Sequence, residues 1–119
     1  MRDSIILKKS KVFALRIIKL YKYLNEIKRE HILSKQLLRC GTSIGANVKE
    51  AVYAQSKADF TAKLFIAQKE CAETEYWLEL LYESEYISKE EFDSIYKDCQ
   101  ELMSMIVAST KTLQGKTNY

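Results

Sequence analysis

Residues Ser43–Ala67 read SIGANVKEAVYAQSKADFTAKLFIA, and this stretch decides the fold that we predict for the whole chain. It contains the end of one helix, a tight junction and the start of a second helix that we expect to be the longest. Gly41 and Gly45 lie four residues apart in the first helix. Because a glycine inside a helix costs roughly 1 kcal/mol relative to alanine, we expect another helix to approach the backbone closely there.

The same stretch carries a polar helix face and a helix start. The face consists of residues spaced four, three and four apart, which are Ser43, Asn47, Glu50 and Ala54. We expect these side chains to form hydrogen bonds across a helical bundle, and a binding site at the same face is the alternative. Ser56 and Asp59 form an S-x-x-D pattern, which predicts a serine N-cap with a carboxylate in the first turn.

The composition favours a single all-α domain. The 119 residues include no proline and three glycines, and helix-forming residues are common. No apolar run approaches the ~20 residues of a membrane span. The first residues lack the long apolar region of a signal peptide, so a cytoplasmic location is expected.

We predict one domain over residues 1–119, an up-down-up-down four-helix bundle with helices at about residues 3–27, 35–53, 57–86 and 89–113. Ser34 is the expected N-cap of the second helix. Ser88 and Glu91 form a capping box at the start of the fourth helix. Gly115 is expected to end that helix.

The third predicted helix has two apolar faces. Its core face steps by four and three through Phe60, Leu64, Ala67, Cys71, Thr74, Leu78 and Leu81. The opposite face carries further apolar residues, which are Phe65, Ala72, Tyr76 and Leu80, with Trp77 beside them. Since a helix that is apolar on both sides is normally buried on both, we predict that this second face is a subunit interface.

Charge is divided unevenly along the chain. Residues 1–50 contain 12 Lys or Arg and four Asp or Glu, whereas residues 51–119 contain seven and 12. The predicted nucleic-acid contacts in the basic half are Lys8, Lys11, Lys19, Lys22, Lys35 and Arg39. A solvated lysine face, or pairing with acidic residues of the same or another copy, explains the pattern equally well.

The residue types that carry catalysis or bind metals do not form a recognisable pattern. Cys40, Cys71 and Cys99 lie on apolar helix faces and are expected to be buried free thiols. His31 has no second ligand at metal-binding spacing, and the three glutamates Glu70, Glu73 and Glu75 resemble ordinary surface residues. We therefore expect no enzyme activity, no metal and no cofactor.

Several motifs resemble the bacterial four-helix-bundle proteins encoded in intervening sequences of 23S ribosomal RNA genes. They are LSKQLLR at 33–39, SIGANVKEA at 43–51, SKADF at 56–60 and LFIA at 64–67. The motif residues include Ser43, Asn47, Glu50, Ser56, Asp59 and Phe60. An accessory protein of diversity-generating retroelements is a more distant relative. Ala51 replaces a glycine common in the family, so the helix is expected to continue to Tyr53.

The resemblance implies an up-down bundle that assembles as a ring of five and associates with RNA. Together with the residue patterns, it predicts a non-enzymatic homo-oligomer that is an RNA-associated accessory protein. Its expected partners are other copies of the chain and RNA or an RNA-processing protein, without a membrane role. The alternative is a protein-interaction scaffold that has no nucleic-acid role.

Overall fold

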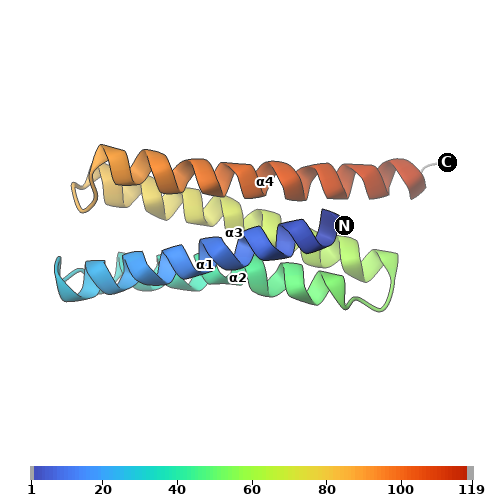
Figure 1. The fold of residues 1–119 in the computed structure, drawn as a ribbon, viewed down its shortest axis with the longest axis horizontal. Coiled ribbons are helices and arrows are strands. Elements are labelled where there is room, and N and C mark those ends of the chain that lie inside the picture. Colours follow the sequence, from blue (N-terminus) through green and yellow to red (C-terminus); the bar gives the residue numbers. More distant parts are fainter. Residues whose placement is uncertain (1, 118–119) are drawn as a thin grey trace.

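The protein is a bundle of four antiparallel helices, shown in Figure 1. We describe it from a computed structural model that places residues 2–117, with side chains described for residues 5–112. The helices are α1 (Arg2–Glu26), α2 (Leu33–Val52), α3 (Lys57–Glu83) and α4 (Lys89–Thr117). They form a rod of 51 × 22 × 21 Å in which each helix packs against the next, and α1 packs more sparsely against α4. The predicted all-α, up-down-up-down bundle is confirmed.

One continuous apolar core runs along the bundle axis. Every predicted core position of α3 from Leu64 to Leu81 is buried, and Phe60 is half-buried at its edge. Each of the other helices contributes a stripe at the same helical spacing. The most deeply buried of these side chains include Ile17, Leu24, Leu37, Ile44, Leu102 and Ile106. The three cysteines are buried free thiols, as predicted.

The two glycines of α2 allow α1 to approach closely. A Cβ atom added at Gly41 would lie 2.8 Å from a side-chain carbon of Ile17. At Gly45 it would lie 3.3 Å from the Ser10 hydroxyl and 3.4 Å from the Ser10 carbonyl oxygen. The close helix contact predicted from the glycine spacing is therefore confirmed, and its partner is α1.

The start of α2 differs from the prediction. The helix begins at Leu33, so Ser34 lies within its first turn and is buried. The carboxylate of Glu30 takes the capping role, because it accepts hydrogen bonds from the backbone N–H groups of Ile32 (3.1 Å), Leu33 (3.0 Å) and Ser34 (2.7 Å). The Ser34 hydroxyl donates to the Glu30 carbonyl at 2.8 Å. A serine was expected because its hydroxyl is a common cap, but a carboxylate offers two acceptor oxygens.

Two other helix starts follow their sequence patterns. The Asp59 N–H donates to the Ser56 hydroxyl at 3.1 Å, and the Glu91 N–H donates to the Ser88 hydroxyl at 3.1 Å. Two helix ends differ from the predictions. α3 ends at Glu83, and α4 continues through Gly115 to Thr117, so α4 is the longest helix. A glycine ends a helix only where the chain turns away, and here it does not.

Candidate nucleic-acid interface

The α1 cations whose side chains are described, from Lys8 onward, fall into two groups according to their position on the bundle. Lys9 and Arg16 face α4 and are paired: Lys9 with Glu101, and Arg16 with Asp98 at 2.7 Å. The other group points away from the core, is exposed and forms no ion pair with any described residue. It consists of Lys8, Lys11, Lys19 and Lys22. From Lys8 to Lys22 the sequence contains six basic residues and no acidic one.

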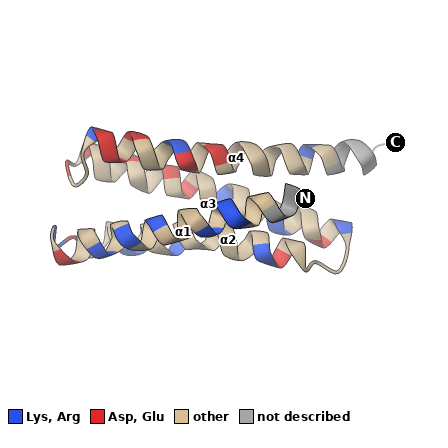
Figure 2. Ribbon diagram, viewed as in Figure 1, with Lys and Arg blue, Asp and Glu red and all other residues tan. Residues whose placement is uncertain are grey.

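α2 extends this cationic surface at both ends. The helices are antiparallel, with Asn25 bonded to Ser34 at one end and Gly45 against Ser10 near the other. Lys35 therefore lies near the C-terminal part of α1, and Lys49 near its N-terminal part. Both are exposed, and no described residue forms an ion pair with either. Figure 2 shows many basic residues on α1 and α2. Acidic residues gather on α3 and α4 near the loop that joins these two helices.

We call these six lysines the basic face: Lys8, Lys11, Lys19, Lys22, Lys35 and Lys49. Lys49 was not among the predicted residues. It lies 14 residues after Lys35, which is close to four helical turns, so helical spacing could have identified it.

Arg39 lies one turn after Lys35 on α2, but its side chain reaches toward α3. Its guanidinium donates to the carboxylate of Glu73 and lies 3.5 Å from that of Glu70, both on α3. Burial raises the pKa of Glu70, although the nearby Arg39 charge opposes this. The structure therefore gathers five of the six predicted nucleic-acid contacts on one surface and places Arg39 in an ion-pair cluster between α2 and α3.

The predicted polar face of α2 is divided between two structural roles. Asn47 donates to the Ser43 carbonyl at 2.9 Å and to the Ser43 hydroxyl at 3.0 Å, so these two residues interact within one helix. Glu50 pairs with Lys63 of α3 at 3.1 Å. The predicted bonding across the bundle is therefore seen for Glu50, whereas the bonds of Ser43 and Asn47 stay within α2, against the prediction.

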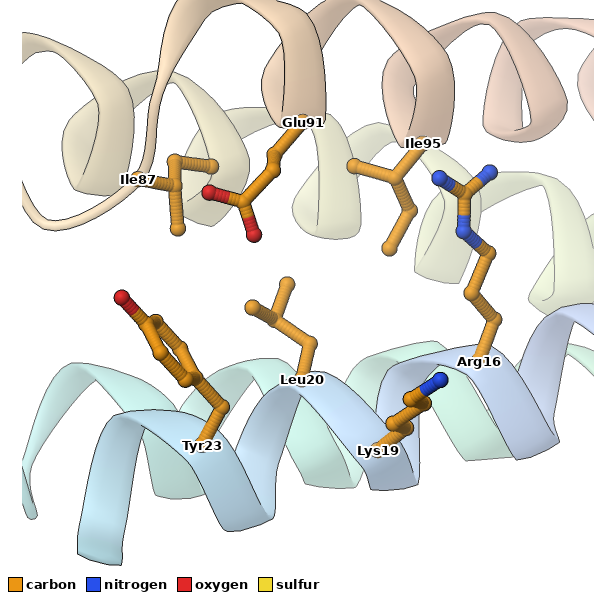
Figure 3. Close-up of a pocket in the computed structure, with 7 residues that line it drawn as sticks. All are labelled: Arg16, Lys19, Leu20, Tyr23, Ile87, Glu91 and Ile95. Carbon is orange, nitrogen blue, oxygen red and sulfur yellow. The ribbon is translucent and has the colours of Figure 1, made fainter. Parts of the chain in front are cut away.

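A shallow cavity lies along the seam between α1 and α4. Figure 3 shows Leu20, Ile87 and Ile95 directed into it, and its volume is about 290 Å³. Two of its polar side chains are held by neighbours within the bundle, because Glu91 bonds to Ser88 and Arg16 bonds to Ser94 at 2.7 Å, whereas Lys19 forms no ion pair with a described residue. The cavity reflects the loose α1–α4 contact.

The described side chains lack the marks of a catalytic or metal centre. No group of three or more His, Cys, Asp or Glu residues among them could hold a metal ion. Burial raises the pKa of the Cys40 thiol to about 11, which disfavours the nucleophilic thiolate at neutral pH. A hydrogen bond with Cys71, together with burial, raises the pKa of Cys99 as well.

The outward side of α3 is a second candidate surface. It carries small and large apolar residues, interrupted by one lysine, in a helical stripe that we call the α3 stripe: Ala58, Ala62, Phe65, Lys69, Ala72, Tyr76 and Leu80. Phe65 is 37% exposed and Tyr76 is 54% exposed, with Ile66 beside the stripe at 40%. Trp77 lies toward α2 and is half-buried, and its indole N–H donates to Glu73 at 2.9 Å.

The family of 23S rRNA-intervening sequence proteins matches residues 2–108 of the chain. The chain belongs to this family. A crystal structure of a protein with unknown function from the S23 ribosomal protein family of Bacteroides thetaiotaomicron VPI-5482 is 51% identical to it, with a TM-score of 0.92. The match covers 93% of the present chain and 99% of the other. A comparison with curated proteins gave no match.

Membership of the 23S rRNA-intervening sequence family confirms the resemblance seen in the motifs at residues 33–67 and the bundle fold. It assigns no reaction to this chain, since the solved relative is itself described as having unknown function. No helix in the described part of the chain is long and apolar enough to cross a membrane.

Proposed function

We propose that this 23S rRNA-intervening sequence family protein is a non-enzymatic RNA-binding accessory protein that contacts the RNA backbone through its basic face. The observation that supports the proposal most directly is that the six lysines of the basic face are not paired with described carboxylates. None of the six forms an ion pair with a described side chain, whereas Lys9, Arg16 and Arg39 are all paired. Lysines that are not held by carboxylates are available to phosphate groups.

The shape of the basic face suits a helical polyanion. From Lys8 to Lys22 the face extends roughly 21 Å along α1, at 1.5 Å per residue. Lys35 and Lys49 widen it onto α2. The basic face consists of lysines alone, whose ammonium groups pair with phosphates and offer no ring on which a base could stack, so we expect contacts to the phosphates. Such binding would depend on shape and charge more than on sequence.

The test is the fluorescence anisotropy of a labelled, structured RNA titrated with the protein over a series of salt concentrations. The variant is Lys11→Ala/Lys22→Ala/Lys35→Ala. We expect it to bind more weakly at ~50 mM salt and to reduce the slope of log K against log salt by about 2, since each phosphate contact contributes ~0.7 to 0.9.

The matched control is Lys57→Ala/Lys97→Ala/Lys111→Ala, which removes the same charge from exposed positions of α3 and α4. This control should keep most of the wild-type slope. If the wild-type protein gives no change in anisotropy at ~50 mM salt, where phosphate contacts are strongest, the proposal is wrong. If both triple variants lose the same amount, net charge rather than the basic face is responsible.

A second candidate function, a self-assembling scaffold for protein partners, is supported by the α3 stripe. An exposed apolar stripe on a helix that is already buried on its other side favours burial against another chain. Its predicted interface residues are Phe65, Ala72, Tyr76, Trp77 and Leu80, and the family resemblance suggests a ring of five in the cytoplasm. Light scattering tests the assembly directly, because a stable monomer at all accessible concentrations would contradict it.

A further inference from the structure

We propose that the cavity between α1 and α4 in Figure 3 binds one unpaired base of the RNA, and that guanine is the preferred base. This inference rests on the RNA binding proposed above. It goes further because it names the kind of RNA that the protein selects, which is a paired stem carrying a single unpaired guanine. Contacts from the basic face alone would not distinguish such an RNA from a fully paired one.

The cavity has the size and the walls of a site for one ring system. Its volume is about 290 Å³, close to the lower end of the roughly 300 to 1,000 Å³ of small-molecule sites. Ile87 and Ile95, both buried, line its α4 side, and Leu20 and Tyr23 line its α1 side. An unpaired base has lost the stacking of its neighbours, and apolar and aromatic side chains can replace that stacking.

Two hydrogen-bonding groups in the cavity are unused, and they come from opposite sides. The Oε1 atom of Glu91 accepts from the backbone N–H and the hydroxyl of Ser88, at 3.3 Å and 3.1 Å. The other carboxylate oxygen and the Tyr23 hydroxyl have no hydrogen-bond partner among the described residues. Figure 3 shows both groups directed into the space between α1 and α4. They can therefore bond to a ligand there without breaking a contact of the bundle.

These two groups suit guanine better than the other bases. A carboxylate oxygen only accepts hydrogen bonds, whereas a phenol hydroxyl both donates and accepts. The Watson–Crick edge of guanine presents two adjacent donor groups, N1–H and N2–H₂, beside the O6 acceptor. Glu91 can accept from the donors while Tyr23 donates to O6. In adenine, cytosine and uracil, a single donor group lies beside acceptors that a carboxylate would repel.

Lys19 connects the cavity to the basic face. It belongs to the basic face, it also lines the cavity, and no described carboxylate pairs with it. A phosphate held by Lys19 therefore places its own base beside the cavity. A second cavity on the same seam, of about 230 Å³, borders Lys8 of the basic face, but both of its carboxylates already form ion pairs with α1. Of these two cavities, the one at Glu91 retains a free acceptor for a base.

The test compares three labelled RNA hairpins, which are fully paired, carry one bulged guanine or carry one bulged uracil. Fluorescence anisotropy is measured over a series of salt concentrations. We expect the wild type to bind the guanine-bulged hairpin about tenfold more tightly than the other two, since a good bidentate base contact discriminates by this order. The slope of log K against log salt should be the same for both bulged hairpins, because a base contact releases no counterions.

Two variants alter the base site, and each has a matched control. Glu91→Gln removes the charged acceptor but keeps the capping box, which accepts glutamine at this position. Its control, Glu90→Gln, makes the same charge change at the adjacent exposed residue, which does not line the cavity. Leu20→Trp fills the cavity without a change of charge, and Leu38→Trp is its control at a half-buried position of α2. The two site variants should bind both bulged hairpins alike, the controls should keep the tenfold preference, and circular dichroism checks folding.

The outcomes separate this inference from the RNA proposal. If the wild type binds the two bulged hairpins equally, or if Glu90→Gln loses the preference as Glu91→Gln does, the base site is wrong and the RNA proposal stands. If no hairpin binds at ~50 mM salt, both are wrong. Guanosine monophosphate should bind far more weakly than the guanine-bulged hairpin, because it lacks the flanking phosphates. Equal affinity would make the cavity a site for free nucleotides and overturn its assignment to RNA.

Discussion

Replacement of Glu30 should reveal how much stability the junction between α1 and α2 contributes. Its side chain is 8% exposed, and its two carboxylate oxygens accept three backbone N–H groups at the start of α2. Loss of a capping acceptor costs ~0.5 to 2 kcal/mol, and loss of a negative charge at a helix N-terminus costs a further ~0.3 to 1 kcal/mol. We therefore expect Glu30→Ala to lower the free energy of unfolding by about 2 kcal/mol.

Glu30→Gln should have an intermediate effect. Its side-chain amide retains one acceptor oxygen but loses the charge and the second acceptor, so we expect a loss of about 1 kcal/mol. Urea denaturation followed by circular dichroism at pH 7 measures both variants at a fixed protein concentration. A loss of 2 kcal/mol corresponds to a decrease of roughly 8 °C in Tm for a domain of this size. Glu26→Ala is the control, since Glu26 is exposed and no described side chain pairs with it.

The effect of Glu30 should also depend on pH. Burial alone would raise the pKa of Glu30, but the three backbone N–H donors and the Ser34 hydroxyl outweigh it, so the pKa in the folded protein lies below the usual 4.5. Its contribution is therefore complete above the unfolded-state pKa and is lost as the pH falls through the folded-state pKa. The wild type and Glu30→Gln should converge in stability as the pH falls below the folded-state pKa of Glu30. Equal stability of Glu30→Ala, Glu26→Ala and the wild type at pH 7 would refute this reasoning.

Four further substitutions test the fold. Glu85 has a φ of 70°, so Glu85→Gly should raise the free energy of unfolding by about 0.5 to 1 kcal/mol in urea denaturation. Ser56→Ala removes the α3 N-cap and should cost about 1 kcal/mol in the same assay, and no loss would contradict the capping role. Leu78→Ala in the core should cost ~2 to 5 kcal/mol, visible as a large decrease in Tm. Gly41→Val should disrupt the α1–α2 contact, because its Cβ would lie 2.8 Å from Ile17, and a melting temperature like that of the wild type would show that α1 can move away.

The features that the sequence predicted correctly depend on local order. The core stripe of α3, the capping boxes at Ser56 and Ser88, and the glycine spacing of α2 all follow from helical periodicity or from contacts within one turn. The errors occurred at helix ends, where a different residue or backbone path from the predicted one was adopted. Glu30 capped α2 in place of Ser34, and α4 continued through Gly115.

The candidate surfaces were only partly predictable. Helical spacing grouped the outward lysines of α1 correctly, but it did not show that Lys9 and Arg16 would face the carboxylates of α4. Helical spacing also placed Arg39 among the predicted nucleic-acid contacts, although Arg39 pairs with glutamates of α3. These outcomes depend on how each helix is rotated in the bundle, which is set by packing between segments far apart in the chain.

The sequence by itself determined four amphipathic helices, their order, the close contact at Gly41 and Gly45, and the excess of apolar residues on α3. It could do so because side chains three or four residues apart share a helix face whatever the surroundings are. Only the tertiary structure decided which cations stay free of carboxylates, and that α1 and α3 lie at opposite corners of the bundle. Those properties arise from the relative rotation and placement of helices, and no short-range pattern in the chain encodes them.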